Sequence, residues 1–163
     1  MSVTRVSCPT KAKLDGVAHH PYTLFGNPLT KSGNIDGGAL GNVPEMVAAV
    51  NYAVKMKLTY PTGPKPFWVT EFGWMTDPPG LGDLSSLRVG LPPKQAGIYS
   101  SETIYRFWSW GIGTAIWYHL TDTLGWPGGL MFQAGGGNPA TAKPSLTAFR
   151  FPLFPKRVSG RVL

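Results

Sequence analysis

The chain alternates three times between a short apolar segment, a long loop and a segment with helical periodicity. The apolar segments are residues 16–20, 67–72 and 113–120, and the helical segments are residues 43–58, residues 94–110 and a short stretch that starts at residue 143. Alternation of this kind predicts parallel strands joined by right-handed helical crossovers. The run FWVTEF, residues 67–72, is typical of a parallel strand buried on both faces. We therefore expect an α/β fold.

The loops that follow the expected strands are much longer than the loops that precede them. They comprise residues 23–42, 75–93 and 121–142, and they are rich in glycine. In a (β/α) barrel, long loops at the carboxyl ends of the strands build the active site. Polar residues stand at all three expected strand ends: His19 and His20, Glu71, and His119 with Asp122. This coincidence indicates a catalytic face.

Composition narrows the classes of function. With 163 residues, the chain has the size of one domain that can bury a core. Its hydrophobic fraction of 42% and charged fraction of 14% are typical of a globular protein. The formal net charge is +7, but the basic residues are dispersed along the sequence and form no basic helix. We therefore expect no nucleic-acid partner and no membrane partner.

Cysteine usage and the N-terminal sequence bear on the compartment. Cys8 is the single cysteine, so an intrachain disulfide is excluded, and one cysteine makes no metal site by itself. The start of the chain, MSVTRVSCPTKAKLDG, has no apolar segment of the kind that a signal peptide requires, and no transmembrane run occurs. As written, the chain is expected in the cytoplasm; as a piece of a longer precursor it would be secreted.

Glu71 is the most distinctive candidate, because it ends the apolar run within PFWVTEFGW, residues 66–74. A carboxylate at such a position can be a structural group bound to an arginine or to backbone donors. Alternatively, a partly desolvated carboxylate has a tunable pKa and acts as a nucleophile or a base. Two neighbours favour chemistry: Gly73 permits close approach to the backbone, and Trp74 offers an aromatic surface to a ligand.

The remaining candidates also have two interpretations each. His20 and Tyr22 stand at the mouth of the first strand, where a histidine alone more often closes a hydrogen-bond network than takes part in a reaction. Trp117 is either a core residue or a surface on which a sugar ring stacks. Asp122 and Trp126 are either rim residues of a cleft or ordinary loop residues. Three histidines without ligand spacing predict no metal, and we expect no other cofactor.

Four segments together resemble a known family. They are DGVAHHPYT, KPFWVTEFGWMTDPP, GIGTAIWYHLTD and KPSLTAFRFPL. Their order and spacing are similar to those of the last three βα units of a clan A retaining β-glycoside hydrolase barrel, as in cellulase-like and family 39-like bacterial enzymes. The resemblance extends from Asp15 to Leu153, and TEFGW is its most specific part.

The resemblance implies roles for four of the candidates. Glu71 matches the catalytic nucleophile, and His20 and Tyr22 match a pair that lines the site, with the tyrosine often orienting the nucleophile. Trp117 matches the tryptophan that forms the floor of the sugar subsite. The implied reaction is hydrolysis of β-linked glucosides or oligosaccharides by double displacement, which uses two carboxylates about 5 Å apart.

The sequence departs from the family in one large respect. The family's acid/base glutamate follows an asparagine, and no Asn-Glu pair occurs in this sequence. A full barrel takes about 250 residues, so we expect residues 1–163 to form a single partial (β/α) TIM barrel of about three strands, with residues 155–163 as a tail. The acid/base would then be Asp122, Asp77 or Glu45, or a carboxylate from a second copy.

A partial barrel has two exposed sheet edges and an uncovered apolar face. Either the chain forms a homo-oligomer, or a second chain supplies the missing half barrel, or the loops and termini rearrange to close the core. Two functions compete with hydrolysis. One is a catalytically weak or inactive carbohydrate-binding fragment that uses Trp74, Trp117 and Trp126, and the other is a plain fragment without activity.

Overall fold

The computed structural model describes residues 10–23, 26–31, 39–78, 90–133 and 139–150. Its centre is a parallel three-stranded sheet in the order β2-β4-β5, made of β2 (Val17–His19), β4 (Phe67–Phe72) and β5 (Thr114–Trp117). Three helices alternate with these strands: α1 (Val43–Lys55), α2 (Pro93–Ser109) and α3 (Pro144–Arg150). The expectation of an α/β fold with parallel strands is confirmed.

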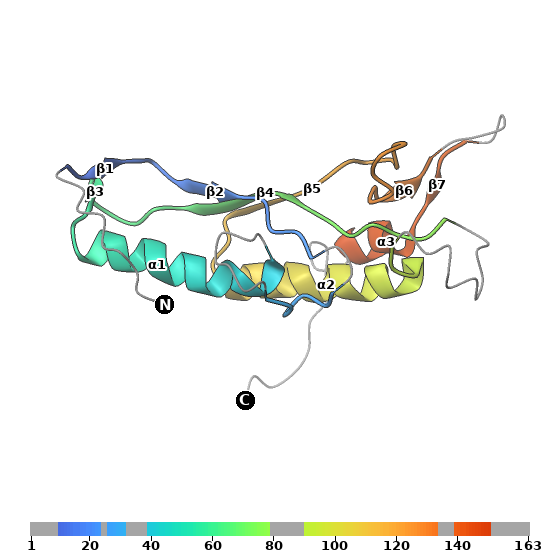
Figure 1. Cartoon of the computed structure of the whole chain (residues 1–163), viewed down its shortest axis with the longest axis horizontal. Helices are drawn as coiled ribbons and strands as arrows, with labels where there is room; N and C mark the ends of the chain where they lie inside the picture. Colours follow the sequence, from blue (N-terminus) through green and yellow to red (C-terminus); the bar gives the residue numbers. More distant parts are fainter. Residues whose placement is uncertain (1–9, 24–25, 32–38, 79–89, 134–138, 151–163) are drawn as a thin grey trace.

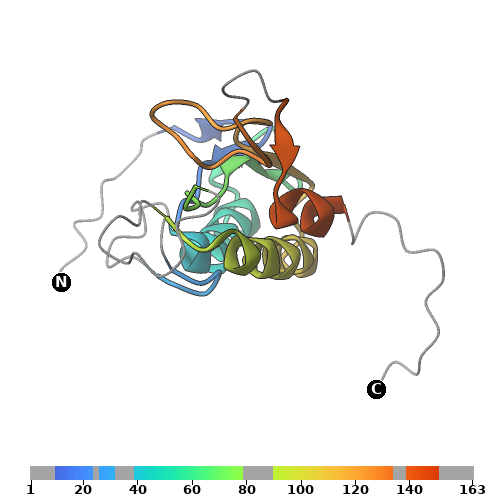
Figure 2. The same ribbon diagram turned by 90° about the vertical axis from the view of Figure 1, so that its right-hand side faces the viewer.

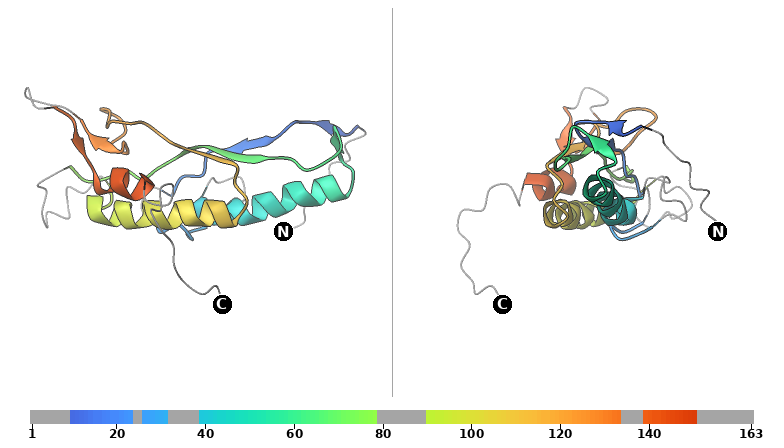
Figure 3. Two further views of the ribbon diagram at one scale, coloured as in Figure 1. Left: turned by 180° about the vertical axis from the view of Figure 1, so that it is seen from behind. Right: turned by 90° about the vertical axis from the view of Figure 1, so that its left-hand side faces the viewer.

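All three helices lie on the same face of the sheet (Figure 1). The view along the molecule in Figure 2 and the two views in Figure 3 show the strands as one layer and the helices as the other. The core between the layers takes Phe67, Val69 and Phe72 from β4, which are at most 3% exposed. Phe107 of α2 and Trp117 of β5 pack against the Phe72 ring at centroid distances of 5.0 and 5.1 Å.

The other face of the sheet is open among the described residues. Side chains from all three strands are exposed there: Ala18, Trp68 at 37% and Ile116 at 49%. The interpretation of residues 67–72 as a strand buried on both faces is therefore wrong. The run is nearly continuous in apolar residues, yet helices cover one face of it alone.

Short elements that the sequence pattern did not predict extend both ends of the sheet. β1 (Ala12–Lys13) pairs in parallel with β3 (Thr59–Tyr60) ahead of the central strands. Beyond them, β6 (Met131–Phe132) pairs in antiparallel fashion with β7 (Thr141–Ala142), inside the segment expected to be one long loop. A single 3₁₀ turn, η2 (Leu40–Asn42), leads into α1. The expected tail at 155–163 lies outside the described residues.

Both long helices end in the same hydrogen-bonded motif, but with different residues in the left-handed position. At the end of α1, the Leu58 N–H donates to the Ala53 carbonyl, and Lys57 has a φ of +56°. At the end of α2, the Ile112 N–H donates to the Phe107 carbonyl, and Gly111 has a φ of +75°. This Schellman motif usually places glycine where α1 has a lysine. It ends α1 three residues before the expected Leu58.

Substitution at the two left-handed positions should change stability in opposite directions. Lys57→Gly removes the steric cost of a β-carbon at positive φ and should raise the free energy of unfolding by about 0.5 kcal/mol. Gly111→Ala introduces that cost and should lower it by about 1 kcal/mol, although no atom lies within 4 Å of the added carbon. Urea unfolding followed by circular dichroism measures both. A destabilised Lys57→Gly variant would contradict this account of the end of α1.

Candidate functional site

The site lies at the carboxyl ends of the three central strands. His20 and Tyr22 follow β2, Glu71 is the next-to-last residue of β4, and Tyr118 follows β5. The Tyr118 N–H donates to the Phe72 carbonyl at 2.9 Å and so continues the pairing of β5 with β4 past the end of the strand. Because the three strands are parallel neighbours in the sheet, their carboxyl ends bring together three segments that are about fifty residues apart in the sequence.

A β-bulge in β4 sets the direction of Glu71. The register pairs Val69 with Ala115 and Phe72 with Trp117, so two residues of β4, Thr70 and Glu71, lie opposite a single residue of β5. Side chains of a strand alternate between faces, and one extra residue reverses the alternation. Val69 and Phe72 consequently both point into the core, and Glu71 is partly exposed instead of pointing toward the helices.

Two side chains approach the same oxygen of Glu71. The Tyr22 hydroxyl donates to Oε2 at 2.9 Å, and His20 Nδ1 lies 3.4 Å from that oxygen. Within the described residues, Oε1 accepts no hydrogen bond. The Glu71 side chain is 33% exposed, so this second oxygen is accessible to an incoming group.

Tyr22 is held in its protonated form. Burial raises the pKa of its phenol, and the Glu71 carboxylate raises that pKa further, because a phenolate there would be poorly solvated and repelled. The phenol therefore remains a hydrogen-bond donor over the whole neutral range. Its geometry and protonation state suit a residue that orients a carboxylate without exchanging a proton with it.

An aromatic wall stands beside the Tyr22–Glu71 pair. Trp126 packs edge-on against Tyr22 and Tyr118, with centroid distances of 5.3 and 5.8 Å, and the two tyrosine rings are 6.2 Å apart. The Trp126 indole lies directly over Gly128, where an added β-carbon would be 2.3 Å from Nε1. Glycine at this position lets the loop close beneath the ring. That Nε1 is buried and has no hydrogen-bond partner among the described residues.

The loop that carries Trp126 is fixed by a buried lysine that the sequence interpretation missed. Lys143, 1% exposed, donates to Asp122 Oδ1 at 2.5 Å, to Thr76 Oγ1 at 2.7 Å and to the Pro127 carbonyl at 3.0 Å. All three donors of the ammonium are thus used. The loop after β4, the loop after β5 and the start of α3 are joined at one nitrogen.

Burial lowers the pKa of the Lys143 ammonium, and the hydrogen bond and charge of Asp122 act in the opposite direction. A buried cation is costly unless it is paired and fully hydrogen-bonded, and this one is both. Asp122 also accepts the Gly129 N–H at 2.9 Å. Its carboxylate is therefore a loop brace, in agreement with the structural interpretation of this residue and not with a role at the rim of a cleft.

Two of the tryptophans expected to contact a sugar are core residues. Trp74 is 0% exposed and its indole N–H donates to the Gly26 carbonyl at 3.1 Å. Trp117 is 7% exposed, and its N–H donates to the Gly128 carbonyl at 2.8 Å. Neither ring has a free face for stacking, because Phe72 and neighbouring aromatic side chains cover them. The core interpretation of Trp117 fits its position, and the expected surface of Trp74 does not exist.

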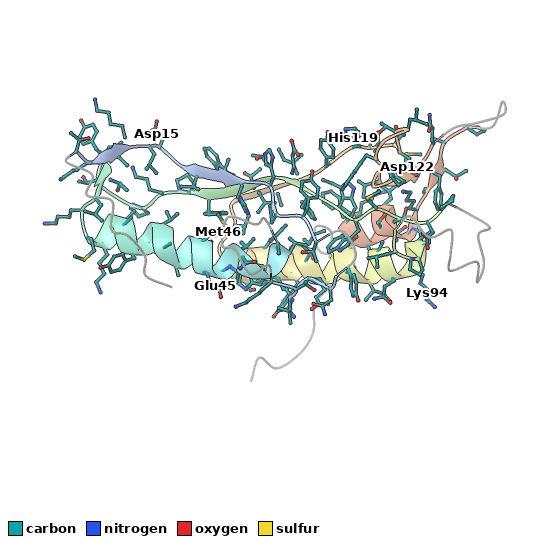
Figure 4. All side chains as sticks on the ribbon, viewed as in Figure 1. Asp15, Glu45, Met46, Lys94, His119 and Asp122 are labelled. Atoms are coloured by element: carbon teal, nitrogen blue, oxygen red, sulfur yellow. The ribbon has the colours of Figure 1, made fainter. Side chains whose placement is uncertain are left out.

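The expected acid/base candidates are separated from Glu71 or already bound. Glu45 lies at the start of α1 in the helix layer, away from His119 and Asp122 on the sheet side (Figure 4), and pairs with Lys31. Asp77 is 5% exposed and accepts the Gly90 N–H at 3.0 Å. Neither carboxylate is placed to donate a proton at the Glu71 face.

The described ranges hold neither a metal-ligand cluster nor a membrane-spanning helix. They contain no group of three or more His, Cys, Asp or Glu side chains that could hold a metal ion. No helix among them has the length and apolarity needed to cross a membrane.

Sequence signals for the residues that were missed differ in strength. Tyr118 follows the inward-facing Trp117, so the alternation of a strand already predicts that it points to the other face. Lys143 precedes the proline that starts α3, a position at which an exposed lysine is the usual finding. No sequence pattern would distinguish it. The bulge at Thr70 could not be predicted from the sequence either, because neither of the two residues in it is glycine.

Removal of the buried cation should destabilise the protein strongly. Lys143→Met leaves Asp122, whose side chain is 13% exposed, without its cation, and should lower the free energy of unfolding by about 3 kcal/mol. Adding Asp122→Asn should recover part of this loss, because the unpaired charge is then gone. Lys65→Met is the matched control, since Lys65 is also buried but makes a single bond, to the Pro61 carbonyl. Equal losses for Lys143→Met and Lys65→Met in urea unfolding would refute the bracing role.

Comparison with known proteins adds no relative. No family model, no curated protein and no solved structure matches the chain. The functional argument therefore rests on the geometry around Glu71 and on the sequence resemblance described above.

Proposed function

We propose that the chain is part of a retaining glycoside hydrolase that acts on β-linked glucosides or short oligosaccharides, with Glu71 as the nucleophile. The observation that carries this proposal is the asymmetric environment of the Glu71 carboxylate. Oε2 is held by Tyr22 at 2.9 Å, whereas no described residue donates to Oε1, which lies on a partly exposed face. A nucleophile that must attack one carbon needs one oxygen positioned and the other available.

The architecture supports the same proposal. The strand order follows the chain order, and the helices cover one face of the sheet (Figure 2). Three consecutive units of a (β/α) barrel wall have this arrangement, whereas doubly wound sheets carry helices on both faces. In barrels, the catalytic groups lie at the carboxyl ends of the strands, which is where His20, Tyr22 and Glu71 meet.

The reaction would proceed in two displacements. In the first, an electron pair of Glu71 Oε1 forms a bond to the anomeric carbon, and the glycosidic bond breaks with its electrons going to the leaving oxygen. In the second, water attacks the same carbon and releases Glu71 as a carboxylate, while a base takes the proton of the water. Tyr22 holds Oε2 throughout and limits rotation of the carboxylate.

The general acid and base is the missing component. Among the described residues, the other carboxylates are engaged or distant: Asp15 at the far end of the molecule (Figure 4), Glu45 with Lys31, Asp77 buried, Glu102 with Arg106, and Asp122 with Lys143. Asp36 and Asp83 lie outside the described residues. We propose that a second polypeptide, a further copy or a separate chain with the missing part of the barrel, supplies the acid/base and packs on the open face around Trp68.

An alternative role is carbohydrate binding without turnover. It is favoured by the aromatic wall of Tyr22, Tyr118 and Trp126, which stays in place whether or not an acid is present. With Trp74 and Trp117 in the core, this wall is a smaller surface than the sequence suggested. A sugar bound there would lie beside Glu71, so the two roles differ in chemistry and not in location.

Pre-steady-state kinetics separate these roles. A dinitrophenyl β-glucoside has a leaving group that departs as an anion, so the first displacement needs no acid, whereas the second still needs a base. The chain alone should therefore release a burst of dinitrophenolate, then turn over about 10²–10⁴ times more slowly than an enzyme with a general base. Mass spectrometry should find the glycosyl group on Glu71. Binding of glucosides without a burst, or the same burst from Glu71→Gln, would favour the binding role.

Loss of the Tyr22 hydroxyl should affect the chemical step. Tyr22→Phe removes a hydrogen bond to a charged group and should slow formation of the glycosyl-enzyme by about 10-fold to 100-fold, with little change in substrate affinity. Tyr118→Phe is the matched control, because Tyr118 contacts the same rings and donates no hydrogen bond to Glu71. Single-turnover rates measure the effect. Equal slowing by both substitutions would show that ring packing, and not the bond to Oε2, matters.

A further inference from the structure

Two pairs of lysines from distant parts of the sequence meet at the end of the molecule beyond the amino ends of the central strands. They meet because β3 follows directly on α1 and pairs with β1 (Figure 1). The Ala12 N–H donates to the Leu58 carbonyl, and Lys13 lies opposite Tyr60 in the register. We define the lysine end as Lys11, Lys13, Lys55 and Lys57. The fold thus brings together four of the fifteen basic residues of the sequence.

The charges of the lysine end are not neutralised. All four side chains are exposed, and none of the ammonium groups has an ion-pair partner or a hydrogen bond among the described residues. The one carboxylate that the structure places at this end is Asp15 (Figure 4). Three of the other described cations are in ion pairs: Lys31 with Glu45, Arg106 with Glu102, and Lys143 with Asp122. Lys65 donates to the Pro61 carbonyl, and Lys94 and Arg150 are exposed without a described ion-pair partner. Among the described residues, four of the six exposed cations without an ion-pair partner are therefore on one surface.

The backbone conformation of Lys57 is a second observation that singles out this surface. Its φ of +56° is a conformation in which a side chain costs about 1 kcal/mol relative to glycine. The equivalent position of α2 has glycine, Gly111. A strained residue persists where its surroundings or its function require it. At the end of α1 the motif therefore has an exposed cation at a position where glycine would give a more stable fold.

Exposed apolar side chains are interleaved with these lysines. The segment YAVKMKLTY, residues 52–60, presents four of them in half-exposed or more exposed positions: Tyr52 at 61%, Met56 at 50%, Leu58 at 54% and Tyr60 at 57%. Lysines beside tyrosines and aliphatic side chains are the composition of surfaces that rest on a lipid interface. The tyrosines suit the headgroup level, and the aliphatic side chains suit the acyl boundary.

We propose that the lysine end is a peripheral contact surface for bilayers rich in anionic phospholipids. The ammonium groups would bind headgroup phosphates, and Met56 and Leu58 would enter the interface. Charge complementarity carries the proposal: four unpaired cations meet a surface of uniform negative charge. A nucleic acid fits less well: Tyr52 and Tyr60 could stack on bases, but the four cations are all lysines without the bidentate fork of arginine, and Met56 and Leu58 have no counterpart on a nucleic acid.

The surface is independent of the site at Glu71. It lies ahead of the strands, whereas Glu71 stands at their carboxyl ends. Binding to a bilayer through the lysine end would therefore leave the carboxyl ends of the strands facing away from the lipid. The proposal does not require that the chain hydrolyse a glycoside.

Vesicle sedimentation of the full chain tests the proposal. Vesicles of phosphatidylcholine with one third phosphatidylglycerol should bind the protein, vesicles of phosphatidylcholine alone should not, and added salt should weaken the binding. Each lysine near an anionic surface contributes a factor of about five, so K11Q/K13Q should weaken binding about 25-fold. K94Q/R150Q removes the same charge from exposed positions elsewhere and should change binding less than about 2-fold. Circular dichroism confirms that each variant is folded.

A second variant tests the apolar contribution. M56S/L58S should weaken binding to anionic vesicles at least about 10-fold, and the remaining binding should stay sensitive to salt. Three results would overturn the proposal: equal binding to neutral and anionic vesicles, equal losses for K11Q/K13Q and K94Q/R150Q, or unchanged binding by M56S/L58S. Tighter binding to duplex DNA than to anionic vesicles at equal ionic strength would assign the lysine end to nucleic acid instead.

Discussion

The bulge in β4 is the constraint on which the candidate site depends. Without the extra residue at Thr70, strict alternation would turn Glu71 toward the helices, into the layer that Phe72 and Phe107 now fill. An ionised carboxylate in that layer would cost several kcal/mol or lose its charge. One inserted residue therefore lets an almost continuous apolar strand contribute to the core. Near the end of the same strand, it places a carboxylate on the other face of the sheet.

The rest of the site is positioned by polar contacts beneath it more than by its own packing. Lys143 joins Thr76, Asp122 and the Pro127 carbonyl, and the loop held in this way places Trp126 against Tyr22. Because Tyr22 in turn holds Glu71, the order of the carboxylate depends, through Trp126, on the buried ammonium of Lys143. The arrangement is stable only when every member is present, as is general for buried polar networks.

The sequence predicted the central strands and the helices, but it missed the four short outer strands and most side-chain directions. Periodicity located the three central strands and the helices, and strand ends identified Glu71, His20 and Tyr22 as neighbours. The sequence pattern failed where the position of a side chain depends on tertiary contacts. An aromatic residue such as Trp74 gives the same sequence pattern in a core and at a ligand-binding surface. From the sequence, Lys143 would be predicted to be exposed. Its burial depends on hydrogen-bond acceptors in two other loops, which the local sequence does not show.

The strand order has a consequence for how stability is distributed. Since β2, β4 and β5 are adjacent in the sheet in the order in which they occur in the chain, each βα unit contacts mainly the unit before it and the unit after it. Such a molecule behaves as a short linear array, whose stability is a sum of unit terms and nearest-neighbour interfaces. The unit built on β4 holds two interfaces and each outer unit holds one. Damage to an outer unit can therefore stay local, whereas damage to the central unit separates the chain into pieces that no longer support one another.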